Sequence, residues 1–264
     1  MPLKTVARDF HGAPRKGRGA PDNREGRYEK QAVELEDDGW MPEAPEAGRR
    51  IATPVTDEFA RSLIQTNDSP DNGPGATINP YRGCEHGCIY CYARPSHSYL
   101  GLSPGLDFET RLFAKTNAVE ILRKELSKPG YRPQPIMLGA NTDAYQPVER
   151  KRGVTRGILE VLAETQHPVC ITPKNALGER DLDLTAPMAR NGLVSVTLSV
   201  TTLDRDIARR MEPRASAPTR RIEVIRRMAA AGIPTGVNAA PVVPFLTDSE
   251  LETILETAAA AGAT

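Results

Sequence analysis

Short apolar segments alternate with amphipathic helical segments over residues 76–264, and this alternation constrains the fold more than any other feature of the chain. The segments with strand character are 76–81, 135–140, 168–172, 193–200 and 234–240, and the helical segments are 110–127, 154–165, 182–190, 219–231 and 247–261. Strands that alternate with helices form a parallel sheet with right-handed crossovers. We therefore predict an α/β fold, in the form of a partial (β/α) TIM-like barrel. Because another strand is due where the chain stops at Thr264, we expect this barrel to be truncated at its C-terminus.

The first 75 residues differ from this region in composition. Residues 1–50 hold few large apolar side chains and cannot bury enough surface to offset the entropy of ordering, so we predict a disordered polar tail. Its early part leans basic through Arg15, Lys16 and Arg18, but it has almost none of the aromatic side chains that stack on bases. This favours a solvated tail over a nucleic-acid arm. Residues 51–75 form a predicted lead-in with a short helix at 56–64 and a loop, and the core domain covers 76–264.

The charge and hydropathy of the chain exclude some classes of protein. The 34 basic and 34 acidic side chains balance, so net charge argues neither for nor against nucleic acid as a partner. The sequence contains no apolar run of about 18 residues, which argues against a membrane-spanning helix. The N-terminus has mixed charge and no apolar stretch of the secretory type. We therefore expect a cytoplasmic protein with no membrane partner.

Three of the four cysteines lie within eight positions, as Cys84, Cys88 and Cys91 in the spacing C-x3-C-x2-C. Three thiols so close together do not easily form paired disulfides, and an odd number leaves one over, whereas all three can reach a metal from one loop. Thiolates are the ligands of zinc and of iron–sulfur clusters. Three ligands instead of four leave one metal coordination position open, as a catalytic site requires.

Simpler interpretations of these residues remain open. The three thiolates are also compatible with a structural zinc site completed by His86 or His97, although zinc sites usually take two ligand pairs from separate turns. We interpret His86 as an ordinary loop residue. Cys170 lies in the middle of a predicted buried strand, and we interpret it as a small core residue.

Polar residues follow the other predicted strands, and in parallel barrels the C-terminal ends of the strands form the active site. A barrel would therefore collect amides, hydroxyls, a carboxylate and a lysine around the cysteines at one mouth. The strand ends read NTDAYQP (141–147), PKN (173–175), SVTT (199–202) and PVVP (241–244).

The cysteine spacing, with Tyr90 before the third cysteine, resembles the signature of the radical S-adenosylmethionine (radical SAM) superfamily. Other stretches are similar to the branch related to spore photoproduct lyase, which is described as DNA-repair-photolyase-like. They are NPYRGC (79–84), ARPSH (93–97), NTDAYQPVE (141–149), RDLDL (180–184) and RMEPR (210–214). The resemblance covers the chain from about residue 50 onward. It implies a 4Fe-4S cluster and S-adenosyl-L-methionine as cofactors, with Cys84, Cys88 and Cys91 as the cluster ligands.

The same resemblance implies roles for residues around the cofactor. Tyr90 would flank the adenine, and Thr142 and Asp143 would lie near the amino group of SAM. Lys174 would approach its carboxylate, and Ser199 its ribose. Two positions depart from the branch: residues 140–142 read Ala-Asn-Thr where spore photoproduct lyase has a cysteine hydrogen donor, and Pro173 replaces a threonine.

The function implied is reductive cleavage of SAM to a 5′-deoxyadenosyl radical that abstracts a hydrogen atom, in a lyase or repair-type reaction with nucleic acid as the candidate substrate. The missing donor cysteine puts thymine-dimer reversal in doubt. A flavodoxin- or ferredoxin-like protein would supply the electron. The alternative is a non-catalytic metal module, with a structural zinc or an electron-transfer iron–sulfur site. Glu149 and Glu212 lie among arginines, and we expect them in salt bridges rather than in acid–base roles.

Overall fold

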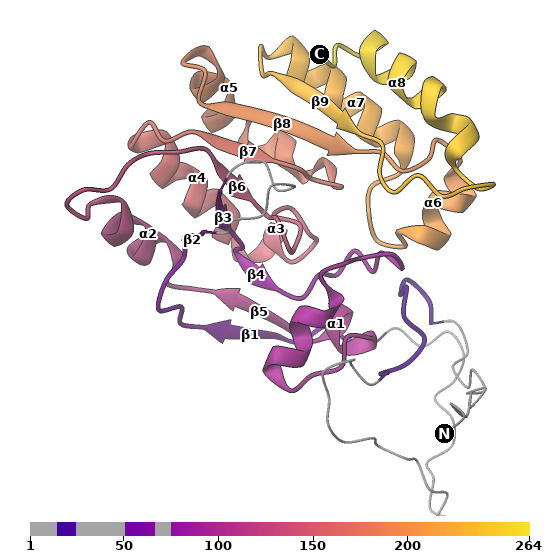
Figure 1. Cartoon of the computed structure of the whole chain (residues 1–264), viewed down its shortest axis with the longest axis horizontal. Coiled ribbons are helices and arrows are strands. Elements are labelled where there is room, and N and C mark those ends of the chain that lie inside the picture. Colours follow the sequence, from indigo (N-terminus) through magenta and orange to yellow (C-terminus); the bar gives the residue numbers. More distant parts are fainter. Residues whose placement is uncertain (1–14, 25–50, 67–74) are drawn as a thin grey trace, which may run out of the picture.

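The computed structural model describes residues 15–24, 51–66 and 75–264. Its larger sheet has six strands in the order β2-β3-β6-β7-β8-β9 (Figure 1). All neighbours from β3 to β9 are parallel, whereas β2 is antiparallel to β3 at one edge. The strands are β2 (Gln65–Thr66), β3 (Ala76–Ile78), β6 (Ile136–Leu138), β7 (Val169–Ile171), β8 (Val194–Ser199) and β9 (Thr235–Asn238). Each of the five predicted strands contains one of the parallel strands, which confirms the predicted α/β class.

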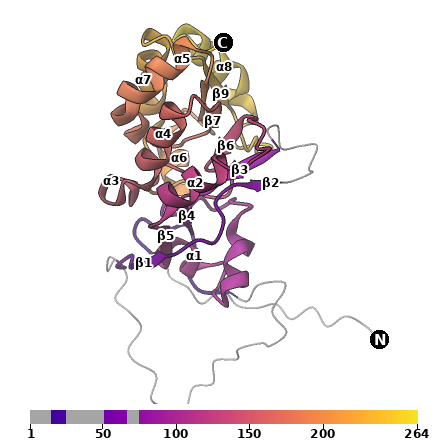
Figure 2. The same ribbon diagram turned by 90° about the vertical axis from the view of Figure 1, so that its left-hand side faces the viewer.

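The helices that connect the parallel strands pack against the sheet and against one another. Figure 2 shows α4, α5 and α7 along one side of the strands. The longer helices are α2 (Ala118–Leu126), α4 (Val154–Glu164), α5 (Leu182–Arg190), α7 (Pro218–Ala230) and α8 (Leu251–Ala260). Shorter ones are α1 (Leu106–Thr110), α3 (Glu149–Arg152) and α6 (Arg205–Met211), with 3₁₀ turns at η1 (Arg94–Leu100), η2 (Ala176–Asp181) and η3 (Asp248–Glu250). In the described part of the chain, no helix has the length and apolar character needed to cross a membrane.

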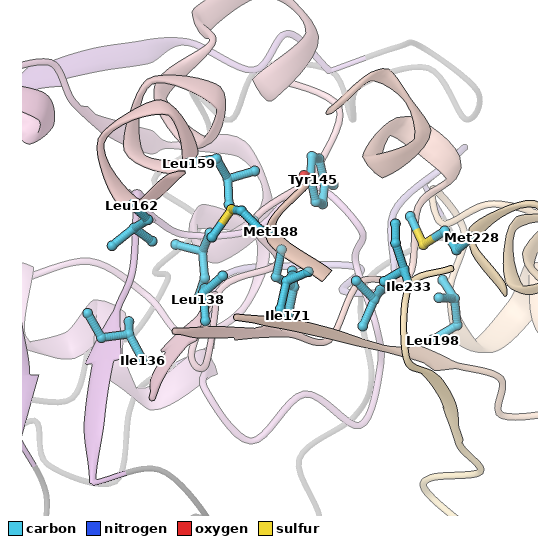
Figure 3. Close-up of a cluster of buried hydrophobic side chains, with 14 of the residues drawn as sticks. Ile136, Leu138, Tyr145, Leu159, Leu162, Ile171, Met188, Leu198, Met228 and Ile233 are labelled. Carbon is cyan, nitrogen blue, oxygen red and sulfur yellow. The ribbon is translucent and has the colours of Figure 1, made fainter. Parts of the chain in front are cut away.

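The two faces of the sheet differ in burial. Ile136 and Leu138 of β6 pair with Val169 and Ile171 of β7, and all four are buried in the main core. Figure 3 shows part of this core, where Leu159, Leu162 and Met188 from the helices meet the strands.

Cys170 lies on the opposite face of the sheet. It is in register with Met137 of β6 and Ser195 of β8, and side chains in register on neighbouring strands share a face. Cys170 is half-buried and takes no part in the main core. The prediction of a core cysteine is therefore wrong, because the alternation of β7 sends this residue away from the helices.

A second sheet of three strands, in the order β1-β5-β4, corrects two predicted helices. Its strands are β1 (Val55–Glu58), β4 (Tyr81–Arg82) and β5 (Leu112–Lys115). The predicted helix at 56–64 is wrong, because Val55–Glu58 pairs with β5 in parallel. The predicted helix at 110–127 is right only from Ala118, since residues 112–115 form β5. Leu112 and Ala114 are fully buried there, so distant pairing and burial override local helical character.

The N-terminal region also departs from the prediction. Residues 15–24 lie against the domain, and the guanidinium of Arg18 is bonded to residues far away in the sequence. The predicted disorder is therefore wrong for this segment. Residues 1–14 and 25–50, including Trp40, lie outside the described residues. The lead-in at 51–66 belongs to the sheets, because it contributes both β1 and β2.

Candidate cofactor site

A cavity of about 520 Å³ opens where the parallel strands β6 to β9 end. Its walls come from the cysteine loop, which we define as residues 84–91, and from the segments that follow the strands. The lining includes residues 77, 84, 86, 88, 90–92, 137, 139–141, 143, 172, 174, 199, 238, 240 and 241. The expected gathering of polar strand ends around the cysteines is therefore present.

The three cysteines of the loop line this cavity as free thiols. Cys84 and Cys88 are buried, and Cys91 is half-buried. Burial raises the pKa of all three, with that of Cys88 at about 12, so that the thiols are neutral until a metal displaces their protons. Among the described residues, no three His, Cys, Asp or Glu side chains converge on a single-ion site. In a cluster each thiolate binds a different iron, so this donor set fits an iron–sulfur cluster.

Two of the stretches that resemble the spore photoproduct lyase branch, residues 79–84 and 141–149, hold the cysteine loop in place. The Gln146 side chain accepts from the amide N–H of Glu85 at 2.9 Å and donates to the carbonyl of Gly83 at 3.1 Å. The Asn79 side chain accepts from the amide N–H of Asn141 at 2.8 Å. The segment after β6 is thus bonded to the segment that carries the first cysteine, which gives both stretches a structural reason for their polar residues.

Asp143 joins the ends of two strands. Its two carboxylate oxygens accept from the amide N–H groups of Tyr145 and Lys174, each at 2.7 Å, and it lines the cavity. Thr142 is placed behind the cavity wall, where its hydroxyl donates to the carbonyl of Tyr81 at 3.1 Å. Asp143 therefore faces the cavity, whereas Thr142 supports the segment after β6.

Lys174 and Tyr90 meet at the buried carboxylate of Glu212. The Lys174 Nζ lies 3.4 Å from Glu212 Oε1 and 5.6 Å from the centre of the Tyr90 ring. The Tyr90 hydroxyl donates to the same carboxylate, and the guanidinium of Arg221 bonds its other oxygen. Burial opposes ionisation of Glu212, but the cations Arg221 and Lys174 outweigh it and hold its pKa at about 2.

The predicted salt bridges of both glutamates are present. Glu212 is paired with Arg221 and Lys174, and Glu149 is paired with Arg180 at 2.7 Å. Ser199 lines the cavity as predicted, and its carbonyl accepts from Arg221 at 2.8 Å. Arg221 therefore ties the Glu212 group to the end of β8.

His86 is the residue of this site that the sequence interpretation missed. Its imidazole is buried in the cavity wall, and neither ring nitrogen has a hydrogen-bond partner among the described residues. Burial lowers the pKa of His86, so the ring is neutral at 3.4 Å from Asp143 Oδ2. Buried polar atoms are normally paired, so this cavity fits a polar ligand. The position of His86 between Cys84 and Cys88 was the available signal.

Several relatives of the chain cover most of its length. It is 38% identical over 253 residues to the uncharacterized protein Rv2578c of Mycobacterium tuberculosis (strain ATCC 25618 / H37Rv), a match that spans 90% of this chain and 74% of that protein. It is 26% identical over 184 residues to the uncharacterized protein MJ0683 of Methanocaldococcus jannaschii, which spans 69% of this chain and 66% of that protein.

Solved structures of spore photoproduct lyase share the fold. The lyase complexed with dinucleoside spore photoproduct is 19% identical, with a TM-score of 0.55 over 76% of this chain and 58% of that chain. A tyrosine-to-phenylalanine variant gives 17% identity and a TM-score of 0.59, over 78% and 57%. A further variant carries bound AdoMet and dinucleoside spore photoproduct, with 19% identity and a TM-score of 0.51 over 71% and 51%. This chain thus spans between half and three fifths of the lyase.

The family model of the radical SAM superfamily matches residues 78–258, which include the cysteine loop and the parallel strands β6 to β9. This family uses a 4Fe-4S cluster and S-adenosylmethionine, which decides between the cluster and the zinc alternatives in favour of the cluster. The chain belongs to the radical SAM superfamily.

Proposed function

We propose that the chain is an iron–sulfur enzyme that cleaves SAM reductively and starts a reaction by hydrogen abstraction. The observation that carries this proposal is the arrangement of three free thiols in one cavity beside the buried imidazole of His86, whose nitrogens have no hydrogen-bond partner in the described part of the chain. When bound, the cluster and SAM supply a 5′-deoxyadenosyl radical, so the demanding chemistry belongs to the cofactors. The protein binds them, orients them and keeps water away.

The residues of the cavity have distinct tasks in this proposal. Cys84, Cys88 and Cys91 hold the cluster. Lys174 binds the SAM carboxylate in this proposal, which is supported by its place in the cavity lining and by the positive charge of its ammonium group. Tyr90, Asp143 and Ser199 complete the contacts to the adenine, amino group and ribose, while Thr142 acts from behind the wall by holding the segment after β6.

In this proposal the six-stranded sheet and its helices form a partial (β/α) barrel, and the mouth of this barrel lies at the cysteine loop. Nucleic acid is the proposed substrate class and a lyase or repair-type reaction the proposed outcome, supported by the fold shared with spore photoproduct lyase. The segment 140–142 has no cysteine, so the hydrogen donor of this chain differs from the one in that lyase. A flavodoxin- or ferredoxin-like protein is the proposed source of the electron.

A cleavage assay tests the first step. The chain is reconstituted with iron and sulfide without oxygen, and SAM and dithionite are added. We expect methionine and 5′-deoxyadenosine in equal amounts, because one electron from the reductant breaks one carbon–sulfur bond and each radical formed takes one hydrogen atom from the protein, the buffer or the reductant. A protein that holds its cluster and binds SAM but forms no 5′-deoxyadenosine would be a non-catalytic iron–sulfur module. A sample without dithionite is the control.

The substrate class is tested separately. Oligonucleotides deuterated in the sugar and in the thymine methyl group are added to the same assay. Transfer of deuterium into 5′-deoxyadenosine identifies nucleic acid as the hydrogen source. If cleavage proceeds and no deuterium is transferred from any oligonucleotide, the nucleic-acid proposal is withdrawn and the radical chemistry stands.

A further inference from the structure

Residues 15–20, which we name the N-terminal strap, touch the backbone of the cysteine loop. A Cβ atom added at Gly19 would lie 1.8 Å from the carbonyl oxygen of Gly87 and 3.1 Å from Cγ2 of Ile89. Contact this close leaves no room for a side chain. The strap is therefore fitted to the stretch between Cys84 and Cys91, although it precedes that stretch by more than sixty residues in the sequence.

A buried carboxylate connects the strap to the second cysteine. Glu109 is fully buried, and it accepts from the amide N–H groups of Gly19 at 3.0 Å and Ala20 at 2.8 Å. It is also paired with Arg94 at 2.6 Å, and the same guanidinium donates to the carbonyl of Cys88 at 2.8 Å. A continuous set of charge-assisted hydrogen bonds thus runs from the strap to a predicted cluster ligand.

Arg18 fixes the strap to the domain. Its buried guanidinium donates to the carbonyl of Glu109 at 2.8 Å, to the Thr53 hydroxyl at 2.6 Å and to the carbonyl of Ile51 at 3.0 Å. Burying a charge is costly unless it is fully hydrogen-bonded, so an arginine with three such partners has a defined place. Lys16, two residues earlier, is exposed and forms no ion pair with a described residue.

We propose that the N-terminal strap is part of the cluster site, with Arg18 and Glu109 as positioning residues that keep the cysteine loop closed against solvent and oxygen. Local opening of a loop is governed by the contacts that it must break. Opening the loop at Gly87 or Cys88 disrupts the packing of Gly19 or the bonds of Glu109 and Arg94. This inference rests on the proposed function, because it assigns the cluster to Cys84, Cys88 and Cys91.

Hydrogen exchange of the full-length apoprotein tests the strap without any cofactor. Arg18→Ala removes the anchor, and Lys16→Ala is the matched control on the same segment. We expect Arg18→Ala to speed exchange of the amides in residues 15–20 and 84–91 by about tenfold or more, with β7 unchanged, because several hydrogen bonds of a charged group are lost. Lys16→Ala should behave as the wild type. Unchanged exchange in the cysteine loop of Arg18→Ala would refute the inference.

Thr53→Val is the milder variant if Arg18→Ala does not fold, since it removes one of the three acceptors of Arg18 and preserves the side-chain shape. We expect about threefold faster exchange in the same two segments, and no change there would count against the strap.

The reconstituted holoprotein gives the second measurement. In air-saturated buffer, the cluster absorbance of Arg18→Ala should fade about tenfold faster than in the wild type and in Lys16→Ala, following the larger population of open loop. Equal fading with faster exchange in the apoprotein would show that the strap holds the loop but does not protect the cluster, and the protective role would be abandoned. A chain that takes up no cluster contradicts the proposed function instead, and the exchange data still decide the strap.

Discussion

Replacement of Cys84, Cys88 or Cys91 by alanine will abolish 5′-deoxyadenosine formation, whereas Cys170→Ala will leave it in place. The three thiols of the loop line one cavity with Lys174, and each would hold a different iron. Removing one leaves two ligands for a cluster that needs three from the protein. We expect the iron content to fall from about four per chain to a small fraction of that value, together with activity below detection. Iron analysis and product chromatography measure both effects.

Cys170 is the matched control for this experiment. It is the fourth cysteine of the sequence and sits in β7, outside the cysteine loop and outside the residues that line the cavity. Its replacement removes one thiol from the chain and no proposed ligand from the cluster. Loss of iron in Cys170→Ala, or full iron and activity in any of the three loop variants, would contradict the assignment of the ligands.

Glu212→Gln will destabilise the fold by about 3–5 kcal/mol, the cost of leaving a buried cation without its partner. Glu212 is 3% exposed, and none of its partners among the described residues is negatively charged. These partners are Arg221, Lys174, Tyr90 and Thr201. The amide keeps most of the shape and removes the charge. Chemical denaturation of the apoprotein gives the free energy of unfolding.

Glu223→Gln provides the comparison. Glu223 is also paired with two arginines, Arg226 and Arg227, but these pairs lie at the surface of α7. Solvent screens such pairs, so the free energy of unfolding should stay within experimental error of the wild type. An equal loss in the free energy of unfolding in the two variants would show that burial does not make the ion pairs of Glu212 stronger than the surface pairs of Glu223.

The same carboxylate predicts a pH dependence. Because the folded pKa of Glu212 is held at about 2, below its ordinary value of 4.5, the folded state binds its proton less readily than the unfolded chain does. The resulting stability is fully present above about pH 5 and is lost as the pH falls toward 2, by about 3 kcal/mol. In Glu212→Gln this part of the pH profile should be flat. If the difference in the free energy of unfolding between the wild type and Glu212→Gln is the same at pH 5 and at pH 2, the assigned pKa is contradicted.

Local sequence patterns predict the helices and strands whose apolar positions coincide with the face that the fold buries. The helices α4, α5 and α7 and the five parallel strands were predicted because apolar periodicity and buried faces coincide in them. The strands β1 and β5 were missed, because each is short and gains its stability from the other, far along the chain. The residue pattern of one short segment does not show which distant strand it pairs with.

The residues of the cofactor site also fall into two groups, those that the sequence predicts and those that only the structure shows. The thiols at 84, 88 and 91 were found from their spacing, and Asp143, Lys174 and Ser199 from their places after strands, and all line the cavity. The burial of the His86 imidazole in the cavity wall was not predicted, because a histidine in a loop has no distinctive sequence pattern. Arg18 was interpreted as part of a solvated tail, since nothing nearby in the sequence shows the distant groups that it bonds.

The sequence by itself determined which thiols are the candidate iron ligands, which order of strands and helices carries them, and which superfamily shares both. Those properties depend on residue type and spacing, which are local. The tertiary structure alone decided how the site is closed and charged, with Glu212 beneath Lys174 and Tyr90 and with the strap against Gly87. Such contacts join residues up to 122 positions apart, and burial fixes their strength, so they exist only once the chain has folded.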